Sequence, residues 1–190
     1  MGLDLMANSA TTHLVWCDLE MTGLDPQNDA IIEMGIIITG PDLKPIVEVQ
    51  HAIWQSDETL AKMEPFVRQM HTKNGLLERV RKSEISLRTA EKEATRVVSE
   101  HVPFGEGILA GNSIYMDRLF LARYMPGFER YLHYRMLDVS SLKILTRAWF
   151  PNAPGRTKDD ANHTVLADLR ASIAELAHYQ YTFFKSPKDF

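Results

Sequence analysis

The chain has 190 residues, of which 45% are hydrophobic and 24% charged, a composition that indicates one soluble globular domain with its own core. Its single cysteine, Cys17, excludes an internal disulfide and favours a reducing compartment. No apolar run approaches the ~18 residues that would span a bilayer, and residues 1–12 lack the features of a signal peptide. The net charge of −4 excludes a basic surface that grips long duplexes, but it leaves a short nucleic-acid substrate open.

The first half of the chain predicts three strands, at residues 13–17, 30–39 and 45–54. The first two runs are apolar on both faces, which is typical of a central sheet that is covered on both sides. The later segments predict alternating helices and short strands. In chain order they are helix 86–101, strand 108–111, helix 117–124, strand 134–139, helix 141–149, loop 151–162 and helix 163–184. This order predicts an α/β sandwich with a mixed sheet.

Two acids, Asp18 and Glu20, follow the first apolar run. Side chains two apart on a strand point the same way, so we expect both carboxylates on one face and Cys17 and Leu19 on the other. Paired carboxylates suit hard divalent cations, and a carboxylate is costly to bury unless it meets a cation. Acid pairs at this spacing also arise by chance in a chain with 25 acids, so metal binding and a solvated strand end remain equal alternatives.

Two further segments carry candidate polar groups. Asp117 follows the string GNSIYM directly after the strand at 108–111, and its simplest interpretation is a helix-opening acid that interacts with the helix dipole. His163 closes the loop and precedes Asp168 by five residues, about 7.5 Å along a helix axis, so the two converge only if His163 lies in the loop or first turn. That arrangement suits a mobile general base above a metal-holding aspartate, although a helix-start histidine with an exposed acid is the simpler interpretation of this segment alone.

The three segments together are more specific than any one of them. Four acids and one histidine, each near a strand end or a helix start, are the residue types of a two-metal site. Two cations about 3.5–4 Å apart activate a water and stabilise the leaving oxygen of a phosphodiester. The four carboxylates would offset the four positive charges of such a pair.

Longer strings around these residues resemble the oligoribonuclease family. DLEMTGLD at residues 18–25 is similar to its first exonuclease motif, and GNSI at 111–114 with Asp117 to the second. HYR with DVS at 133–140 resembles a further block, and His163 with Asp168 resembles the third motif. The order Asp, Glu, Asp, His, Asp is that of the histidine-containing DEDD exonucleases.

The resemblance implies a ribonuclease H-like fold, with a mixed central sheet flanked by helices. It places one exonuclease domain at residues 13–184, between a loose N-terminus at 1–12 and a C-terminal tail at 185–190. The implied activity is that of a metal-dependent 3′→5′ exoribonuclease. Such an enzyme degrades dinucleotides and short oligoribonucleotides to mononucleotides, the final step of RNA degradation.

The resemblance also implies the roles of individual side chains. Four acids would hold two Mg²⁺ or Mn²⁺ ions: Asp18, Glu20, Asp117 and Asp168. His163 would take the proton from the attacking water. The two bases would meet Leu24, Phe66 and His71, with Leu24 as a wedge between them. The 5′ phosphate of the substrate would meet Ser113, Arg135, Ser140 and Lys143. In the family Tyr134 and Arg135 come from the partner subunit, so the resemblance implies a homodimer that completes the site.

Two positions depart from the family pattern. Phe66 stands where tryptophan is usual, which keeps an aromatic platform but gives it less area and no indole donor. Ala167 replaces the first of two adjacent acids that are frequent in the third motif, while the spacing from His163 identifies Asp168 as the metal ligand. Neither change removes a catalytic residue, so we expect them to affect affinity more than activity.

Two other functions use many of the same residues. A DEDD exonuclease that acts on longer single-stranded RNA or DNA shares the catalytic set but has no need of a phosphate cap. A non-catalytic dinucleotide-binding module has no need of a general base, which counts against it. We expect a cytoplasmic protein with short RNA as its substrate and no membrane partner.

Overall fold

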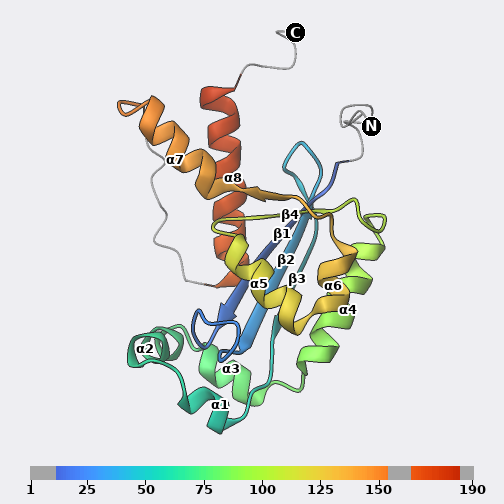
Figure 1. The fold of residues 1–190 in the computed structure, drawn as a ribbon, viewed down its shortest axis with the longest axis vertical. Coiled ribbons are helices and arrows are strands. Elements are labelled where there is room, and N and C mark those ends of the chain that lie inside the picture. Colours follow the sequence, from blue (N-terminus) through green and yellow to red (C-terminus); the bar gives the residue numbers. More distant parts are fainter. Residues whose placement is uncertain (1–11, 154–163, 185–190) are drawn as a thin grey trace.

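Residues 12–153 and 164–184 are described by a computed structural model, in which helices cover both faces of a five-stranded sheet (Figure 1). From edge to edge the strands are β3 (Pro45–Ala52), β2 (Ile31–Thr39), β1 (Leu14–Met21), β4 (Ile108–Gly111) and β5 (Met136–Asp138). The pairs β3–β2 and β2–β1 are antiparallel, whereas β1–β4 and β4–β5 are parallel. The predicted mixed sheet flanked by helices is therefore confirmed.

Each face of the sheet has its own set of helices. On one face α4 (Leu87–Ser99), α5 (Tyr115–Tyr124) and α6 (Pro126–Tyr131) pack on Val15, Cys17 and Leu19 of β1. On the other face α8 (Val165–Phe183) packs on Leu14 and Trp16, with α7 (Val139–Trp149) beside it. The alternating side chains of β1 thus enter two separate cores. None of the described helices is long and apolar enough to cross a membrane.

Strand β2 and the long helices form where the sequence pattern predicts them. All nine residues of β2 are buried, as expected for a strand that is apolar on both faces. In α4 the predicted stripe of Ala90, Ala94, Val97 and Val98 is buried, and Ser86 caps the helix by accepting a hydrogen bond from a backbone N–H. These patterns extend over several turns, which makes their period visible in the sequence.

Four short helices are absent from the predicted elements. Three of them, α1 (Asp57–Ala61), α2 (Pro65–Lys73) and α3 (Leu76–Lys82), form a cap at one end of the sheet (Figure 1), and the fourth is α6. Each has between five and nine residues, too few for a helical period to show. Local signals start them instead, such as the Ser56 cap of α1 and a proline in the first turn of α2 and of α6.

The indole of Trp16 gives a test of polar pairing in the core. Its Nε1–H donates to Thr39 Oγ1 at 3.0 Å, and both side chains are fully buried. Thr39→Val keeps the shape of the side chain but leaves the indole donor unpaired, so we expect the free energy of unfolding to fall by about 1–3 kcal/mol. Urea denaturation measures this loss. Thr39→Ser, which keeps the hydroxyl, should lose less, and an unchanged unfolding midpoint for the valine variant would contradict the account.

Candidate active site

Asp18 and Glu20 lie inside β1, on the face that α8 covers. The predicted strand ended at residue 17, but β1 continues to Met21 because β2 keeps pairing with it as far as Ile31. The predicted alternation is confirmed, since Cys17 and Leu19 enter the core on the opposite face. The two carboxylates therefore stand side by side at the end of β1 that extends beyond the β4 pairing.

A third carboxylate comes from the start of α8. This helix begins at Val165 with Thr164 as its N-cap, and Asp168 lies in its first turn. The start of the helix lies beside the C-terminal end of β1 (Figure 1). Carboxylate oxygens of Asp18, Glu20 and Asp168 all lie within 4.8 Å of one another. The structure thus brings together three of the four predicted metal ligands.

Asp117 lies beside this group but is held in a different way. It is buried in the first turn of α5, as the sequence predicts for a helix-opening acid. Its Oδ1 accepts a hydrogen bond of 2.9 Å from the backbone N–H of Leu19, the residue between Asp18 and Glu20. Because the β4 pairing of β1 ends at Trp16, this N–H has no partner strand on that side, and the aspartate takes its place. Asp117 therefore fixes the strand from which the other two acids project.

The acids repel one another in a partly buried setting. Burial raises the pKa of Asp18 well above its usual range, and the charges of Asp117, Glu20 and Asp168 raise it further. Burial, followed by repulsion from Glu33, raises the pKa of Glu20 to about 7. Burial likewise raises the pKa of Asp117 to about 7. Full ionisation of this cluster therefore needs added positive charge, and all of its donors are the carboxylate oxygens that hard divalent cations prefer.

Glu33 is a buried acid that sequence reasoning missed. It pairs in register with Glu20 on the neighbouring strand and is 1% exposed. Its Oε1 lies 2.7 Å from Arg79 Nη1 of α3, with which it forms an ion pair, and accepts a hydrogen bond from Gln50 Nε2 of β3 at 2.9 Å. The ion pair engages the charge of Arg79 and joins the α1–α3 cap to the sheet. The one signal in the sequence is a lone acid inside the apolar run of residues 30–39.

Of the remaining predicted site residues, His163 lies outside the described part of the chain. His71 of α2 is fully buried, with Nε2 3.1 Å from the carbonyl oxygen of Met21 and 4.0 Å from the Glu20 carboxylate. Phe66 of the same helix is 76% exposed. The structure thus joins His71 to the acidic cluster and leaves the phenyl ring of Phe66 open to solvent.

Leu24 is 70% exposed on a loop whose polar groups bond to one another. Asp29 accepts hydrogen bonds from the Thr22 hydroxyl at 2.8 Å and from the Asp25 backbone N–H at 3.0 Å, on either side of Leu24. The carbonyl of Asp29 accepts a hydrogen bond from the Tyr124 hydroxyl at 2.7 Å, which joins this loop to the end of α5. An exposed leucine on a loop fixed in this way is available to contact a ligand.

Ser113 and Ser140 meet at the start of α7, as a shared phosphate site requires. The N–H of Ser113 lies 3.0 Å from the Ser140 hydroxyl and 3.0 Å from Asp138 Oδ1, and Asp138 caps α7. Ser113 has a φ of +53°, a left-handed conformation that is uncommon for serine. Asn112 accepts a hydrogen bond from the Ser140 hydroxyl at 3.0 Å. Asp138 and Asn112 were not predicted as site residues, although both stand in the quoted motif strings.

Lys143, Tyr134 and Arg135 lie in the same region but differ in their surroundings. The ammonium of Lys143 pairs with Glu175 of α8 at 2.9 Å, so its charge is already balanced within the chain. Tyr134 is 70% exposed and stacks on His133 with ring centroids 4.5 Å apart. The guanidinium of Arg135 lies 5.3 Å from the Tyr134 ring centre. Glu175 was missed, because its position on a long helix gives no signal in the sequence.

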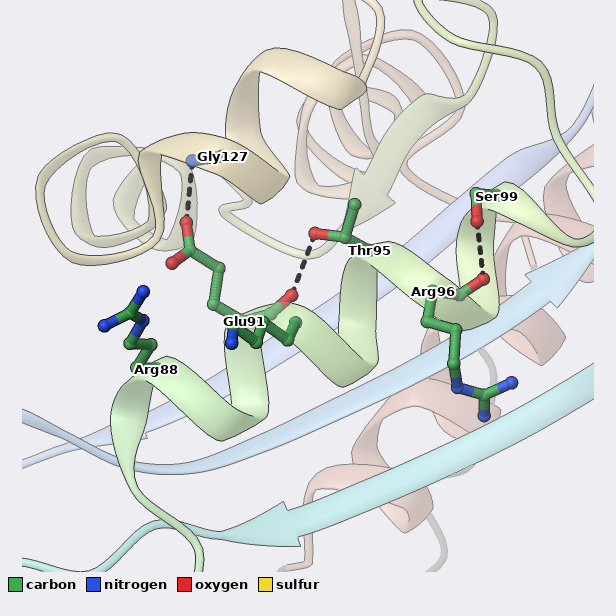
Figure 2. Close-up of a pocket in the computed structure, with 7 residues that line it drawn as sticks. Arg88, Glu91, Thr95, Arg96, Ser99 and Gly127 are labelled. Carbon is green, nitrogen blue, oxygen red and sulfur yellow. Dashed lines mark hydrogen bonds between the residues drawn. The ribbon is translucent and has the colours of Figure 1, made fainter.

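A separate groove lies between α4 and α6, where Figure 2 shows its lining. Its volume is about 480 Å³, and Arg88, Glu91 and Arg96 are among the residues around it. Glu91 accepts a hydrogen bond of 2.6 Å from the Gly127 N–H, which ties the start of α6 to α4 (Figure 2). The groove contains none of the predicted site residues, so we assign it to the joint between these two helices.

The comparisons with known proteins agree with this geometry. The exonuclease family model matches residues 15–176 of the chain. An oligoribonuclease of Ectopseudomonas mendocina (strain ymp) is 47% identical over 175 residues, which cover 92% of this chain and 97% of that protein. An oligoribonuclease of Wigglesworthia glossinidia brevipalpis is 46% identical over 174 residues, which cover 91% and 94%. The chain belongs to the oligoribonuclease family. The family expected from the motif strings is confirmed.

Solved structures of exonuclease I share the fold. Exonuclease I from Methylocaldum szegediense matches with a TM-score of 0.66 and 21% identity over 90% of this chain. A zinc-bound complex of E. coli exonuclease I with single-stranded DNA matches with a TM-score of 0.70 and 17% identity over 91% of it. This chain spans 41% of the length of either protein. The likeness confirms the ribonuclease H-like fold expected for this oligoribonuclease-family chain.

The raised pKa values predict how pH changes the stability of the metal-free protein. At Glu20 and Asp117 the folded protein binds protons more tightly than the unfolded chain, because folding raises their pKa values from 4.5 and 3.8 to about 7. Their contribution to stability is therefore present at low pH and is lost as the pH rises through about 7. Thermal denaturation in EDTA across this pH range measures the loss, and added Mg²⁺ should reverse it near neutral pH.

Asp18→Asn isolates the cluster from the other titrating groups. Removing one of the mutually repelling charges should make this variant more stable than the wild type in EDTA at pH 8. The difference should shrink toward pH 5, where the acids of the wild type are protonated. If the difference in stability between Asp18→Asn and the wild type is the same at pH 5 and at pH 8, the carboxylates do not repel one another in the folded protein.

Proposed function

We propose that this protein, a 3′→5′ exoribonuclease of the oligoribonuclease family, degrades dinucleotides and short oligoribonucleotides to mononucleotides, the last step of RNA degradation. The observation that carries the proposal is the meeting of Asp18, Glu20 and Asp168 within 4.8 Å, with Asp117 bonded between the first two. Family membership supports the same chemistry. A reducing compartment suits the single cysteine, so we place the reaction in the cytoplasm.

The acidic cluster fits a pair of Mg²⁺ or Mn²⁺ ions. All four residues offer carboxylate oxygens as donors. Burial leaves their charges in need of a cation. We assign Asp18, Glu20, Asp117 and Asp168 as the residues that hold the ions. When bound, such ions supply an activated water and stabilise the charge that develops on the phosphate. In this chain Asp117 has the further task of holding β1 in place through Leu19.

His163 is proposed as the general base. It stands directly before Thr164, the N-cap of the helix that carries Asp168, and it matches the histidine of the third family motif. A neutral imidazole at this point accepts a proton from the attacking water and passes it to solvent. Support for this role comes from the sequence position and the family.

The residues proposed to bind the substrate fall into two groups. Leu24 and Phe66 are exposed apolar side chains, and the Nε2 atom of His71 lies 4.0 Å from the Glu20 carboxylate. Apolar and aromatic surfaces of this kind hold bases without reading their identity. Ser113 and Ser140 place two hydroxyls at the start of α7, where they can donate to a phosphate. A site that binds a terminal 5′ phosphate favours a short substrate.

A homodimer is proposed to complete this phosphate site with Tyr134 and Arg135 of the second copy. The exposed side of α7 is apolar, with Ile144 and Trp149 each 67% exposed, and the edge strand β5 exposes Met136 at 39%. A continuous apolar surface on a helix next to an open sheet edge is typical of a protein interface. We propose a second copy of this chain as its occupant, because the face adjoins Tyr134 and Arg135, which the family takes from the partner.

A length series of end-labelled RNAs tests the function. With Mg²⁺ present, we expect a 5′-phosphorylated dinucleotide to be cut faster than any RNA up to a 20-mer, because the proposed phosphate site binds the 5′ end of the strand whose 3′ nucleotide is removed at the acids. Gel analysis of the products measures the rates. Asp18→Asn and Asp168→Asn should fold and show no turnover. A dinucleotide cut no faster than the 20-mer would favour an exonuclease for long strands, and tight binding without hydrolysis would favour a binding module.

The proposed dimer has a matched test. Ile144→Asp places a charge in the apolar face of α7, so we expect the variant to be monomeric in light scattering after size-exclusion chromatography. Its kcat/KM on the dinucleotide should fall at least about tenfold, because each site loses the residues of its partner. Ile46→Asp changes an exposed isoleucine on β3, the opposite sheet edge, and should leave the dimer intact. A wild-type protein that is monomeric at micromolar concentration would rule the dimer out.

A further inference from the structure

The sheet and α8 approach each other closely at Gly35, a buried glycine of β2. Gly35 pairs in register with Asp18 on the neighbouring strand, so the two positions face the same side of the sheet. A Cβ at this glycine would lie 2.8 Å from Val165 Cγ2 and 2.9 Å from Val165 Cβ. These distances are too short for two carbon atoms that are not bonded. The backbone of Gly35 has no positive φ, so only the helix opposes a side chain there.

The segment of α8 above Gly35 is the segment that carries a metal ligand. Val165 is the first residue of the helix, and Asp168 follows within the same turn. Leu169, the next residue, would lie 3.3 Å from the same Cβ. Val165 and Leu169, which lie on either side of Asp168 in the helix, are both buried against the sheet. The height of the helix above Gly35 therefore sets how far Asp168 stands from Asp18 and Glu20.

We propose that Gly35 and Val165 form a positioning pair for the metal site, in which the missing side chain of one and the stiff side chain of the other fix the gap between α8 and the sheet. Valine in a helix is largely confined to one rotamer, so it does not turn away from an added methyl group. The first turn of α8 has to move outward instead. This inference rests on the proposed metal role of Asp168, and it adds a residue that does not itself contact ion or substrate.

A shift of this kind affects metal binding as well as folding. Mg²⁺ requires near-ideal octahedral geometry with ligands at about 2.0–2.1 Å, so a carboxylate displaced by a few tenths of an ångström no longer completes the site. Displacements of about 1 Å cost about a hundredfold in rate in well-positioned active sites. Gly35→Ala should also lose stability, because overpacking a buried contact is destabilising, so the loss of metal affinity is the effect that distinguishes it from overpacking elsewhere.

The test compares Gly35→Ala with a matched glycine elsewhere. Mn²⁺ binding is measured by electron paramagnetic resonance titration, and folding by thermal denaturation in EDTA. We expect Gly35→Ala to raise the Kd for Mn²⁺ at least about tenfold and to lower kcat more than KM changes. Gly107→Ala is the control, because its Cβ would lie 2.9 Å from Val15 Cγ2 and 3.1 Å from Val102 Cγ1, on the face away from the acids. It should lose stability but bind Mn²⁺ as the wild type does.

Rescue by a second substitution separates positioning from general packing. Val165→Gly removes both atoms that lie within 3.0 Å of the new Cβ, the Cγ2 and the Cβ of Val165, so Gly35→Ala with Val165→Gly should recover Mn²⁺ affinity to within about threefold of the wild type. The double variant also decides the case if Gly35→Ala alone does not fold. Wild-type Mn²⁺ affinity in Gly35→Ala, or a folded double variant that does not bind Mn²⁺, would overturn the proposal. A wild-type protein that does not bind Mn²⁺ would overturn the metal site itself.

Discussion

Mutual repulsion among partly buried carboxylates is the constraint on which the rest of this structure depends. Asp18, Glu20 and Asp168 meet within 4.8 Å, and burial together with neighbouring charges raises the pKa values of Asp18 and Glu20. A fold tolerates such a cluster only if strong packing holds its members in place. Here the fully buried β2 and the two cores on either face of β1 provide that packing. Stability is thus highest in the metal-free protein when the acids are protonated, and lowest in the state that is ready to take up cations.

The arrangement also shows why the four acids come from distant parts of the chain. Strand β1 supplies two acids, and the helices α5 and α8 each supply one from their first turn. First-turn acids interact favourably with the positive end of the helix dipole, so each helix reduces part of the repulsion that its own acid creates. The parallel pairing of β1 with β4 places α5 beside the extended end of β1. Topology, more than local sequence, therefore assembles the cluster.

Much of the site was predictable because its residues lie in short sequence motifs and in a strand with a regular alternation. The strings around Asp18, Asp117 and Asp168 identify the family, and the alternation along β1 assigns the faces correctly. The bond between Asp117 and the Leu19 N–H was not predictable, because it depends on where the β4 pairing stops. Glu33 was missed for two reasons. It lies in an apolar run, and its partner Arg79 lies on a helix too short to recognise from the sequence. The role of His163 stays a prediction, because that residue lies outside the described part of the chain.

The loop that carries Leu24 has a consequence for how a ligand is received. Asp29 bonds to both sides of the leucine, and Tyr124 anchors the loop to the helix of Asp117. The conformational entropy of this segment is therefore given up when the protein folds and not when a ligand arrives. A preorganised apolar tip accepts a partner in one orientation and releases it without a slow rearrangement of the backbone. Such a surface loses little conformational entropy on binding, so more of the free energy of each contact remains available as affinity.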